Sequence, residues 1–507
     1  MDSPHQYPPE FSDEHILELV AQIKDWQVNH GFLLKLVQSE TEHSVLSHPV
    51  GVSVFPTLFP RSLFHRALDL QRVYNQLYCA IAEDERWLFN ATKDLIPVDP
   101  LAAALWRIHN EAKKAGFAQD VSAGIFRSDY MLHCHGDTSP SSLTSLAGVT
   151  LKQVEFNAFS CAGGTHANKA ADMHRFLAKK GAYSPGKQDQ LGDYSVEASA
   201  LPPNTNIQSL ASCLASAHAI YGPPKSSLAK ETAVLFIVQP NNFNIADERP
   251  IEYALWDRGQ PIPTYRLDFG HDVLQHTWLT DCRELLFHPP GCCEARILLE
   301  KSAAIKCPTV LSHLSTFKKV QQALTAPGVL EHFLSSENAA AIRGTFIALY
   351  PLDESNAGMH ARSIACDEQQ SADYILKPSR EGGGHNIYSN EIPDFLARIP
   401  QSQRSSYILM ERIRSPSVAN ILMGPAGIEG GEVISELGVF GCCLWRKEPD
   451  SSRGCQLLEN LAAGWSFKTK HADIDEMSVV KGFGCFDTPL LVDKQESRDE
   501  SSQKDRA

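Results

Sequence analysis

Hydrophobic positions along this chain follow a helical period in several stretches. Residues 12–37 carry apolar side chains three and four positions apart, and residues 62–90 and 100–116 repeat this spacing. Such a pattern predicts amphipathic helices. Gly31 and Gly116 are candidate helix ends, because glycine readily takes the conformation that closes a helix. Shorter helices are predicted at residues 207–220, 294–306 and 316–325.

Short apolar runs alternate with these helical stretches. The run ETAVLFIVQP at 231–240 is apolar at successive positions, which predicts a strand buried on both faces. Two further strands are predicted at 372–378 and 406–413. The polar stretch 180–206 predicts a linker or long surface loop, and the tail from residue 493 onward predicts disorder. Because strands and helices interleave, the fold class is α/β or α+β.

Composition narrows the class of protein. The chain has 507 residues, of which 43% are hydrophobic, so it forms a globular core in roughly three domains or lobes. Its net charge of −14 argues against a partner that is nucleic acid or an anionic membrane. We expect no transmembrane helix and no secretion signal. The 13 cysteines include no Cys-x-x-Cys spacing, which favours a reduced, cytoplasmic protein.

One glycine-rich segment points to phosphate chemistry. Lys377 ends a predicted strand, and the three glycines 382–384 follow soon after. Such a loop can bring backbone N–H groups against phosphate oxygens. Lys377 would add positive charge, Glu381 an oxygen ligand for Mg²⁺, and Asn386 a polar contact. Taken alone, a glycine triplet of this kind is more often a flexible hairpin that carries a solvated Lys and Glu.

A second polar segment lies in a strand pattern at residues 151–160. Strand alternation places Glu155 and Asn157 on one face, where their oxygens could bind Mg²⁺. A polar face in solvent is the competing interpretation. Arg127 by itself indicates a structural ion pair more often than a catalytic group, and Lys318 at a helix start is ordinarily solvated.

Together the segments resemble eukaryotic glutathione synthetases, a family of ATP-grasp ligases, in the order of that family and across residues 118–492. The matching segments are FRSDYM, QVEFN, EARILLEKSAAIKCP, KKVQQAL, LKPSREGGGHNIY, YILMERI and ISELGVFG. The resemblance implies ATP held between two sheets, an inserted α/β substrate-binding domain and a lid. The predicted parts are 1–220 (N-terminal part of the ATP-grasp body), 221–316 (substrate-binding domain, shortened near 287–294), 317–492 (C-terminal part with lid and glycine-rich loop) and 493–507 (tail).

By the same resemblance, Lys318 and Lys377 contact phosphates, Glu436 lies at the ribose and backbone groups near Met410 read adenine. The complete set implied for ATP is Glu155, Lys318, Lys377, Glu381, Gly382, Gly383, Gly384, His385, Asn386, Tyr388, Met410, Glu411, Arg412, Ile413, Glu436, Lys470 and Glu476. Two Mg²⁺ ions are implied, with the ligands Glu155, Asn157 and Glu381.

The implied reaction is ligation of γ-glutamylcysteine to glycine. ATP phosphorylates the dipeptide carboxylate, and the glycine amine attacks the acyl phosphate to give glutathione, ADP and phosphate. Arg127 is the implied catalytic residue at the reacting carboxylate, and the family is expected to form homodimers. The implied substrate-binding residues are Arg127, Ser160, Asn242, Asn244, Glu248, Lys468, Val479 and Val480.

The sequence departs from the family around the peptide donor. After residues 283–291 the chain passes through two cysteines directly into EARILLEKS. A Phe-Arg-x-Gly-Tyr motif, whose Arg and Tyr bind the γ-glutamyl end in the family, has no counterpart. The second hydroxyl of the family's Ser-x-Ser is replaced by Ala162, its Glu-Arg-Asn is Asn242-Phe243-Asn244, and a nearby Gln is Glu248.

The acceptor end departs as well. Lys468 replaces an arginine of the family and so lacks the bidentate fork. Residues 477–482 replace the glycine- and alanine-rich loop, although the backbone N–H groups of Val479 and Val480 could still face a carboxylate. The nucleotide half is therefore retained while the peptide half is altered, and the predicted pocket is basic, with Arg127, Lys318, Lys377, Lys468 and Lys470.

Three explanations follow from this uneven pattern. A short exon skipped in the gene model fits one clean gap but not scattered substitutions. A diverged ligase with another carboxylate donor fits both features. A catalytically weak nucleotide-binding paralogue also fits, but it has less need of three metal ligands. Glutathione synthesis is the leading hypothesis.

Overall fold

The computed structural model describes residues 7–36, 46–134, 146, 148–184, 196–225, 227, 229–238, 244–268, 291–379, 385–448 and 454–493. Its helices are α1 (Asp13–Asn29), α2 (Arg61–Glu83), α3 (Glu85–Thr92), α4 (Pro100–Ala115), α5 (Gly164–Lys179), α6 (Asn206–Tyr221), α7 (Ile245–Trp256), α9 (Gly291–Lys301), α10 (Val310–Ser315), α11 (Lys318–Ala323), α12 (Val329–Phe333), α13 (Ser336–Arg343), α14 (Asn356–Ala365) and α15 (Glu391–Arg398). Within the described ranges, none of these helices has the length and apolar character needed to cross a membrane.

The strands form one large sheet and several smaller ones. They are β1 (Leu33–Leu36), β2 (Leu46–Pro49), β3 (Val52–Ser53), β4 (Thr57–Pro60), β5 (Val121–His133), β6 (Thr150–Asn157), β7 (Val234–Val238), β8 (Thr264–Asp268), β9 (Leu349–Pro351), β10 (Tyr374–Pro378), β11 (Ile387–Tyr388), β12 (Tyr407–Glu411), β13 (Val418–Gly424), β14 (Gly427–Lys447), β15 (Cys455–His471), β16 (Cys485–Phe486) and β17 (Pro489–Val492). The interleaved helices and strands confirm the predicted mixed α and β class.

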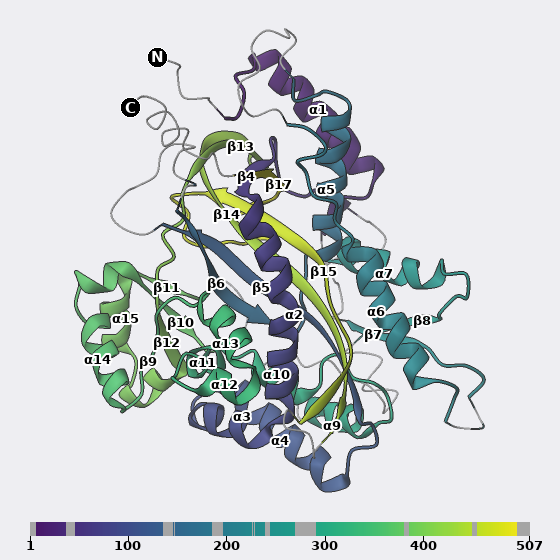
Figure 1. Ribbon diagram of the computed structural model, residues 1–507, viewed down its shortest axis with the longest axis vertical. Coiled ribbons are helices and arrows are strands. Elements are labelled where there is room, and N and C mark those ends of the chain that lie inside the picture. Colours follow the sequence, from purple (N-terminus) through teal and green to yellow (C-terminus); the bar gives the residue numbers. More distant parts are fainter. Residues whose placement is uncertain are drawn as a thin grey trace, which may run out of the picture.

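A seven-stranded sheet in the order β13–β3–β16–β15–β14–β5–β6 forms the centre of the molecule (Figure 1). All its neighbouring strands are antiparallel except β16 and β3. Strand alternation divides the side chains of β14 between two cores. Val439, Cys443 and Trp445 pack in the core that includes α2, and Cys442 and Leu444 pack in the core that includes α6.

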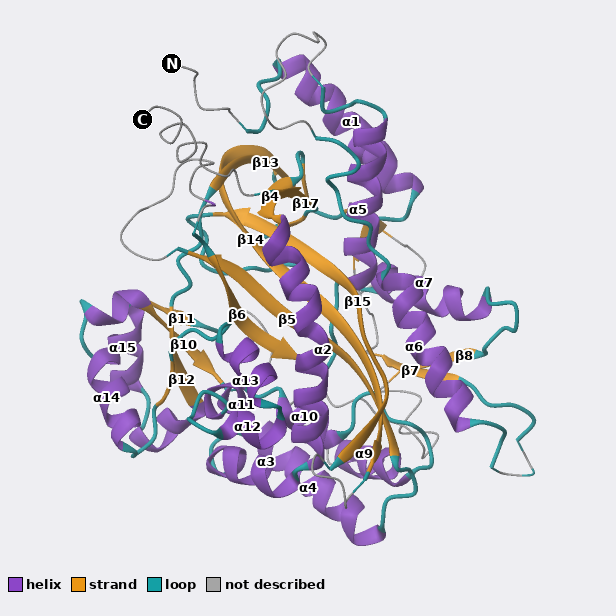
Figure 2. Cartoon of the chain, viewed as in Figure 1, coloured by secondary structure: helices purple, strands orange, loops and turns teal. Residues whose placement is uncertain are grey.

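A smaller four-stranded sheet in the order β11–β10–β12–β9 is antiparallel throughout. Figure 2 shows α14 and α15 beside it, away from the central sheet. Apolar residues of both helices, such as Ile364 and Leu396, form one core with Leu376 of β10 and Leu409 of β12. The other side of this sheet is thereby left to face the central sheet.

Strands β7 and β8 form a separate parallel pair, packed with α6 and α7. The predicted strand at 231–240 is confirmed, but its predicted burial on both faces is wrong, because Leu235 is 44% exposed. A two-stranded sheet covered on one face leaves alternate residues in solvent. The predicted domain boundaries at 220 and 316 stay predictions.

Two predicted helices are shorter than their hydrophobic patterns. The helix predicted at 12–37 ends at Asn29, and Gly31 has a φ of +59° before β1 begins. The helix predicted at 62–90 is broken at Asp84, whose carboxylate accepts a hydrogen bond from the Trp87 N–H at 2.9 Å. An N-cap of this kind starts a new helix inside a continuous apolar pattern. Gly116 ends α4 as predicted, with a φ of +82°.

Candidate active site

A cavity of about 880 Å³ lies between the central sheet and the four-stranded sheet. Strands β5, β6, β14 and β15 line one side and β10, β11 and β12 the other, and the chain after β15 closes part of it. The predicted site residues that line this cavity are Arg127, Glu155, Asn157, Ser160, Asn244, Lys318, Lys377, Asn386, Tyr388, Met410, Arg412, Ile413, Glu436, Lys468, Lys470, Glu476, Val479 and Val480.

Other predicted site residues do not line the cavity. Glu411, the last residue of β12, lies between the lining residues Met410 and Arg412 in sequence but does not line the cavity, and His385 also lies outside the lining. Glu248 forms an ion pair with Arg266 of β8 instead of lining the cavity. The predicted residues that lie outside the described part of the chain are Asn242, Glu381, Gly382, Gly383 and Gly384.

Two lysines meet a carboxylate at one end of the cavity. Lys318 Nζ lies 3.1 Å from Glu155 Oε2, and Lys377 Nζ donates to the Val154 carbonyl at 3.4 Å. Lys318 is the first residue of α11 and is 8% exposed, so it is not the solvated side chain that a lysine at a helix start ordinarily is. Burial alone would raise the pKa of Glu155, but the charges of Lys318 and Lys377 hold it well below its usual range. Burial lowers the pKa of Lys377, and Glu155 partly offsets this.

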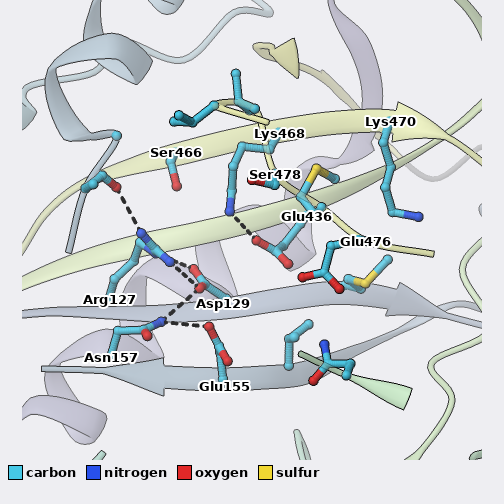
Figure 3. Close-up of a pocket in the computed structure, with 18 of the residues that line it drawn as sticks. Arg127, Asp129, Glu155, Asn157, Glu436, Ser466, Lys468, Lys470, Glu476 and Ser478 are labelled. Carbon is cyan, nitrogen blue, oxygen red and sulfur yellow. Dashed lines mark hydrogen bonds and ion pairs between the residues drawn. The ribbon is translucent and has the colours of Figure 1, made fainter. Parts of the chain in front are cut away.

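Arg127 is held by a carboxylate that the sequence analysis missed. Its Nε and Nη2 each donate to Asp129 at 2.7 Å, and its Nη1 donates to the Ala162 carbonyl at 2.9 Å (Figure 3). Asp129 is two residues further along β5, so strand alternation puts it on the face of Arg127. The i, i+2 spacing in FRSDYM is the signal that could have identified it.

Glu155 and Asn157 lie on one face of β6, as predicted, and both line the cavity. Asn157 Nδ2 donates to Asp129 Oδ2 at 3.0 Å and lies 3.3 Å from Glu155 Oε1. Within the described residues, no cluster of three or more His, Cys, Asp or Glu side chains is placed to hold a metal. A carboxylate beside an amide oxygen nevertheless fits the hard oxygen chemistry of Mg²⁺.

Lys468 and Glu436 face each other across β14 and β15 at 2.5 Å (Figure 3). All five cations predicted for the basic pocket line the cavity, but acidic side chains line it as well and offset most of their charge. Buried cations require such partners, since an unpaired charge is costly to remove from water. The acidic lining residues are Asp129, Glu155, Glu436, Asp475 and Glu476.

Two contacts join the four-stranded sheet to the chain after β15. Arg412 Nη2 lies 2.8 Å from Asp475 Oδ1, and the Tyr388 hydroxyl donates to Glu476 Oε2 at 2.8 Å. We call this pair of contacts the clasp. Asn386 Nδ2 donates in turn to the Tyr388 hydroxyl at 3.2 Å. All four clasp residues line the cavity, at the end of the sheet where β11 and β12 lie on either side of β10.

This geometry matches a known structural class. A solved structure described as a glutathione synthetase like-effector from Globodera pallida in apoform superposes with a TM-score of 0.69 and 21% identity, covering 97% of this chain and 100% of that chain. At this level of identity the likeness establishes the fold, which is that of a glutathione synthetase-like protein of mixed α and β structure.

Sequence comparisons give the family. The model of the eukaryotic glutathione synthase ATP-binding domain matches residues 13–491. The glutathione synthetases of Bos taurus and Homo sapiens are each 32% identical, over 95% and 94% of this chain and 98% of each relative. A "Glutathione synthetase large chain" of Schizosaccharomyces pombe is 28% identical over 93% of this chain and 97% of that relative. The chain belongs to the eukaryotic glutathione synthase family, whose members are ATP-binding ligases.

Proposed function

We propose that the protein is a glutathione synthetase that uses ATP to ligate γ-glutamylcysteine to glycine through an acyl phosphate. The observation that carries the proposal is the shared cavity. It brings Lys318, Lys377, Glu155 and Arg127 together from four segments of the chain, between the two sheets. The family resemblance implies a nucleotide at this place. Phosphoryl transfer needs this concentration of charged side chains, since its catalysis consists mainly of positioning and electrostatic stabilisation.

Each group has a role in this proposal. Lys318 and Lys377 place positive charge at the phosphates, and Arg127 presents its remaining N–H donors to the reacting carboxylate. Glu155 and Asn157 would hold Mg²⁺, which supplies neutralisation of the phosphoryl charge when it is bound. The walls of the cavity and the clasp keep water from the acyl phosphate, which would otherwise hydrolyse.

A different carboxylate donor is the second candidate, and the position of Glu248 favours it. Glu248 replaces a substrate-binding glutamine of the family, and it is engaged by Arg266 away from the cavity. A donor that no longer needs this contact would explain the change. The binding-only alternative makes no use of the paired Glu155 and Asn157.

The remaining parts of the proposal rest on the family resemblance and the sequence. They are a homodimeric assembly, a cytoplasmic location, two Mg²⁺ ions and an ATP-grasp body carrying an inserted substrate-binding domain.

A coupled ADP-release assay on the full-length protein tests the function. We expect ADP formation that requires both γ-glutamylcysteine and glycine, and a large loss of that activity in Glu155→Gln. The matched control is Glu331→Gln, because Glu331 also carries an ion pair, with Arg343 on an exposed surface. ADP release indifferent to both substrates would contradict the ligase, and release that requires another carboxylate would support the second candidate.

A further inference from the structure

Asp129 is the point at which two functional side chains of the cavity meet. Its Oδ1 accepts from Arg127 Nε, and its Oδ2 accepts from both Arg127 Nη2 and Asn157 Nδ2. The side chain is nearly inaccessible to solvent, at 1% exposed. Arg127 lies opposite Asn157, and Asp129 lies opposite Glu155, in the register of β5 and β6. The Asp129 carboxylate therefore contacts Arg127, which is predicted to bind the substrate, and Asn157, which is predicted to bind the metal.

The contact with Asn157 fixes which end of its amide faces the cavity. Two carboxylates, Asp129 and Glu155, lie within 3.3 Å of Nδ2. The reversed amide would place Oδ1 against both carboxylates. An amide oxygen cannot donate a hydrogen bond, so it would be repelled by the carboxylate oxygens. Asn157 Oδ1 is thus directed away from them, and it accepts no hydrogen bond within the described part of the chain. An amide oxygen in this position is what Mg²⁺ binding requires.

The contact with Arg127 fixes the direction of its guanidinium group. Three of its five N–H donors are used by Asp129 and the Ala162 carbonyl. One N–H on each terminal nitrogen is left for an anionic substrate group. The guanidinium group is planar, and two parallel hydrogen bonds to the Asp129 carboxylate fix its orientation. Its two remaining N–H donors therefore keep a fixed direction.

A glycine on the neighbouring strand β14 leaves room for the ion pair between Arg127 and Asp129. Gly438 of β14 lies opposite Asp129. A Cβ atom at Gly438 would stand 2.5 Å from Ser466 Oγ, 2.6 Å from Asp129 Oδ1 and 3.0 Å from Arg127 Cδ. These neighbours are side-chain atoms, so a methyl group there would displace the ion pair and leave the backbone of the sheet in place.

We propose that Asp129 is a positioning residue that aims Asn157 Oδ1 at the metal and the free edge of Arg127 at the substrate carboxylate. This inference rests on the proposed function for the identity of the substrate, while its metal arm can be measured without turnover. The competing role is a purely structural ion pair that stabilises the junction of β5 and β6.

Binding of Mn²⁺ in the presence of ADP, followed by electron paramagnetic resonance on the full-length protein, separates the two roles. We expect Asp129→Asn to weaken Mn²⁺ binding roughly tenfold, as removal of a ligand-orienting group does. The KM for γ-glutamylcysteine should rise in parallel wherever ligase activity is present. If the parent protein had no ligase activity, the proposed function would be refuted, but the effect of Asp129→Asn on Mn²⁺ binding could still be interpreted.

Gly438→Ala keeps both charged groups and displaces them, so it should weaken Mn²⁺ binding in the same direction. Gly430→Ala is its matched control on the same strand, because a Cβ there meets nothing closer than 3.8 Å. Folded variants at positions 129 and 438 with parental Mn²⁺ affinity would overturn the proposal. Failure of both variants to fold would assign the pair to stability alone and would also overturn it.

Discussion

Lys468 and Glu436 occupy opposing positions on β15 and β14, and Lys468 Nζ lies 2.5 Å from Glu436 Oε1. Both side chains are mostly buried, at 17% and 10% exposed. The family resemblance assigns Lys468 to the substrate and Glu436 to the ribose, so this pair links two subsites. A substrate carboxylate must share the single ammonium group of Lys468 with Glu436.

Replacing Lys468 with arginine should therefore improve binding of glycine. A guanidinium can bind Glu436 with one edge and a second carboxylate with the other. We expect Lys468→Arg to lower the KM for glycine by about fivefold, from about 1 kcal/mol of added hydrogen bonding. Lys447→Arg is the control, because Lys447 pairs with Glu83 at the other end of β14. An unchanged KM would mean that Lys468 does not contact the acceptor.

Opening the clasp should speed the release of nucleotide. Arg412 and Asp475 are 36% and 46% exposed, and an exposed ion pair contributes up to about 1 kcal/mol. We expect Asp475→Ala to raise the ATP release rate about two- to fivefold in stopped-flow fluorescence, with a smaller effect at high salt. Asp373→Ala removes the comparable pair with Arg414, and Asp373 does not line the cavity. Equal effects of the two substitutions would refute a gating role.

The buried carboxyl of Asp487 should give stability a distinct pH dependence. It accepts hydrogen bonds from the hydroxyl groups of Ser53, Thr57 and Thr469. Thr469 lies in sequence between Lys468 and Lys470, which both line the cavity. Burial raises the pKa of Asp487 from 3.8 to about 6, against the lowering effect of these hydroxyl groups. The native state therefore binds this proton more tightly than the unfolded chain. The resulting stabilisation is complete below about pH 4 and is lost as the pH rises through about 6.

Asp487→Asn stays neutral throughout this range. Relative to the parent, we expect its free energy of unfolding to improve by about 3 kcal/mol between pH 4 and pH 8. Urea unfolding at several pH values measures the difference. Asp394→Asn is the control, since Asp394 is 80% exposed, and its difference from the parent should stay flat. If the difference in free energy of unfolding between Asp487→Asn and the parent did not change with pH, the pKa of the buried carboxyl would not be raised in the native state.

The strand that carries Glu155 and Asn157 is anchored through the residue between them. Phe156 points to the opposite face of β6 and stacks on Tyr78 of α2, with ring centroids 3.6 Å apart. We expect Phe156→Ala to lower the free energy of unfolding by about 3–5 kcal/mol. Phe176→Ala on α5 should cost less than about 1 kcal/mol, since Phe176 is 50% exposed. Similar losses in denaturant unfolding would contradict this anchoring role.

Local spacing along the chain determined much of the site. Strand alternation alone put Glu155 and Asn157 on one face, and the segment containing Lys377 ended its strand at the cavity, as β10 does. The order of the motifs placed the chain in its family, which the family match confirms. These features depend on neighbours a few residues apart, so the sequence contains them directly.

Only the tertiary structure decided which charges face one another. Glu436 and Lys468 are far apart in sequence and meet because β14 pairs with β15, while Asp129 reaches Asn157 because β5 pairs with β6. The same packing buried Lys318 and took Glu248 to Arg266. Strand pairing and burial depend on the whole core, in which each residue's partners come from distant segments. A local pattern of residues therefore cannot identify those partners.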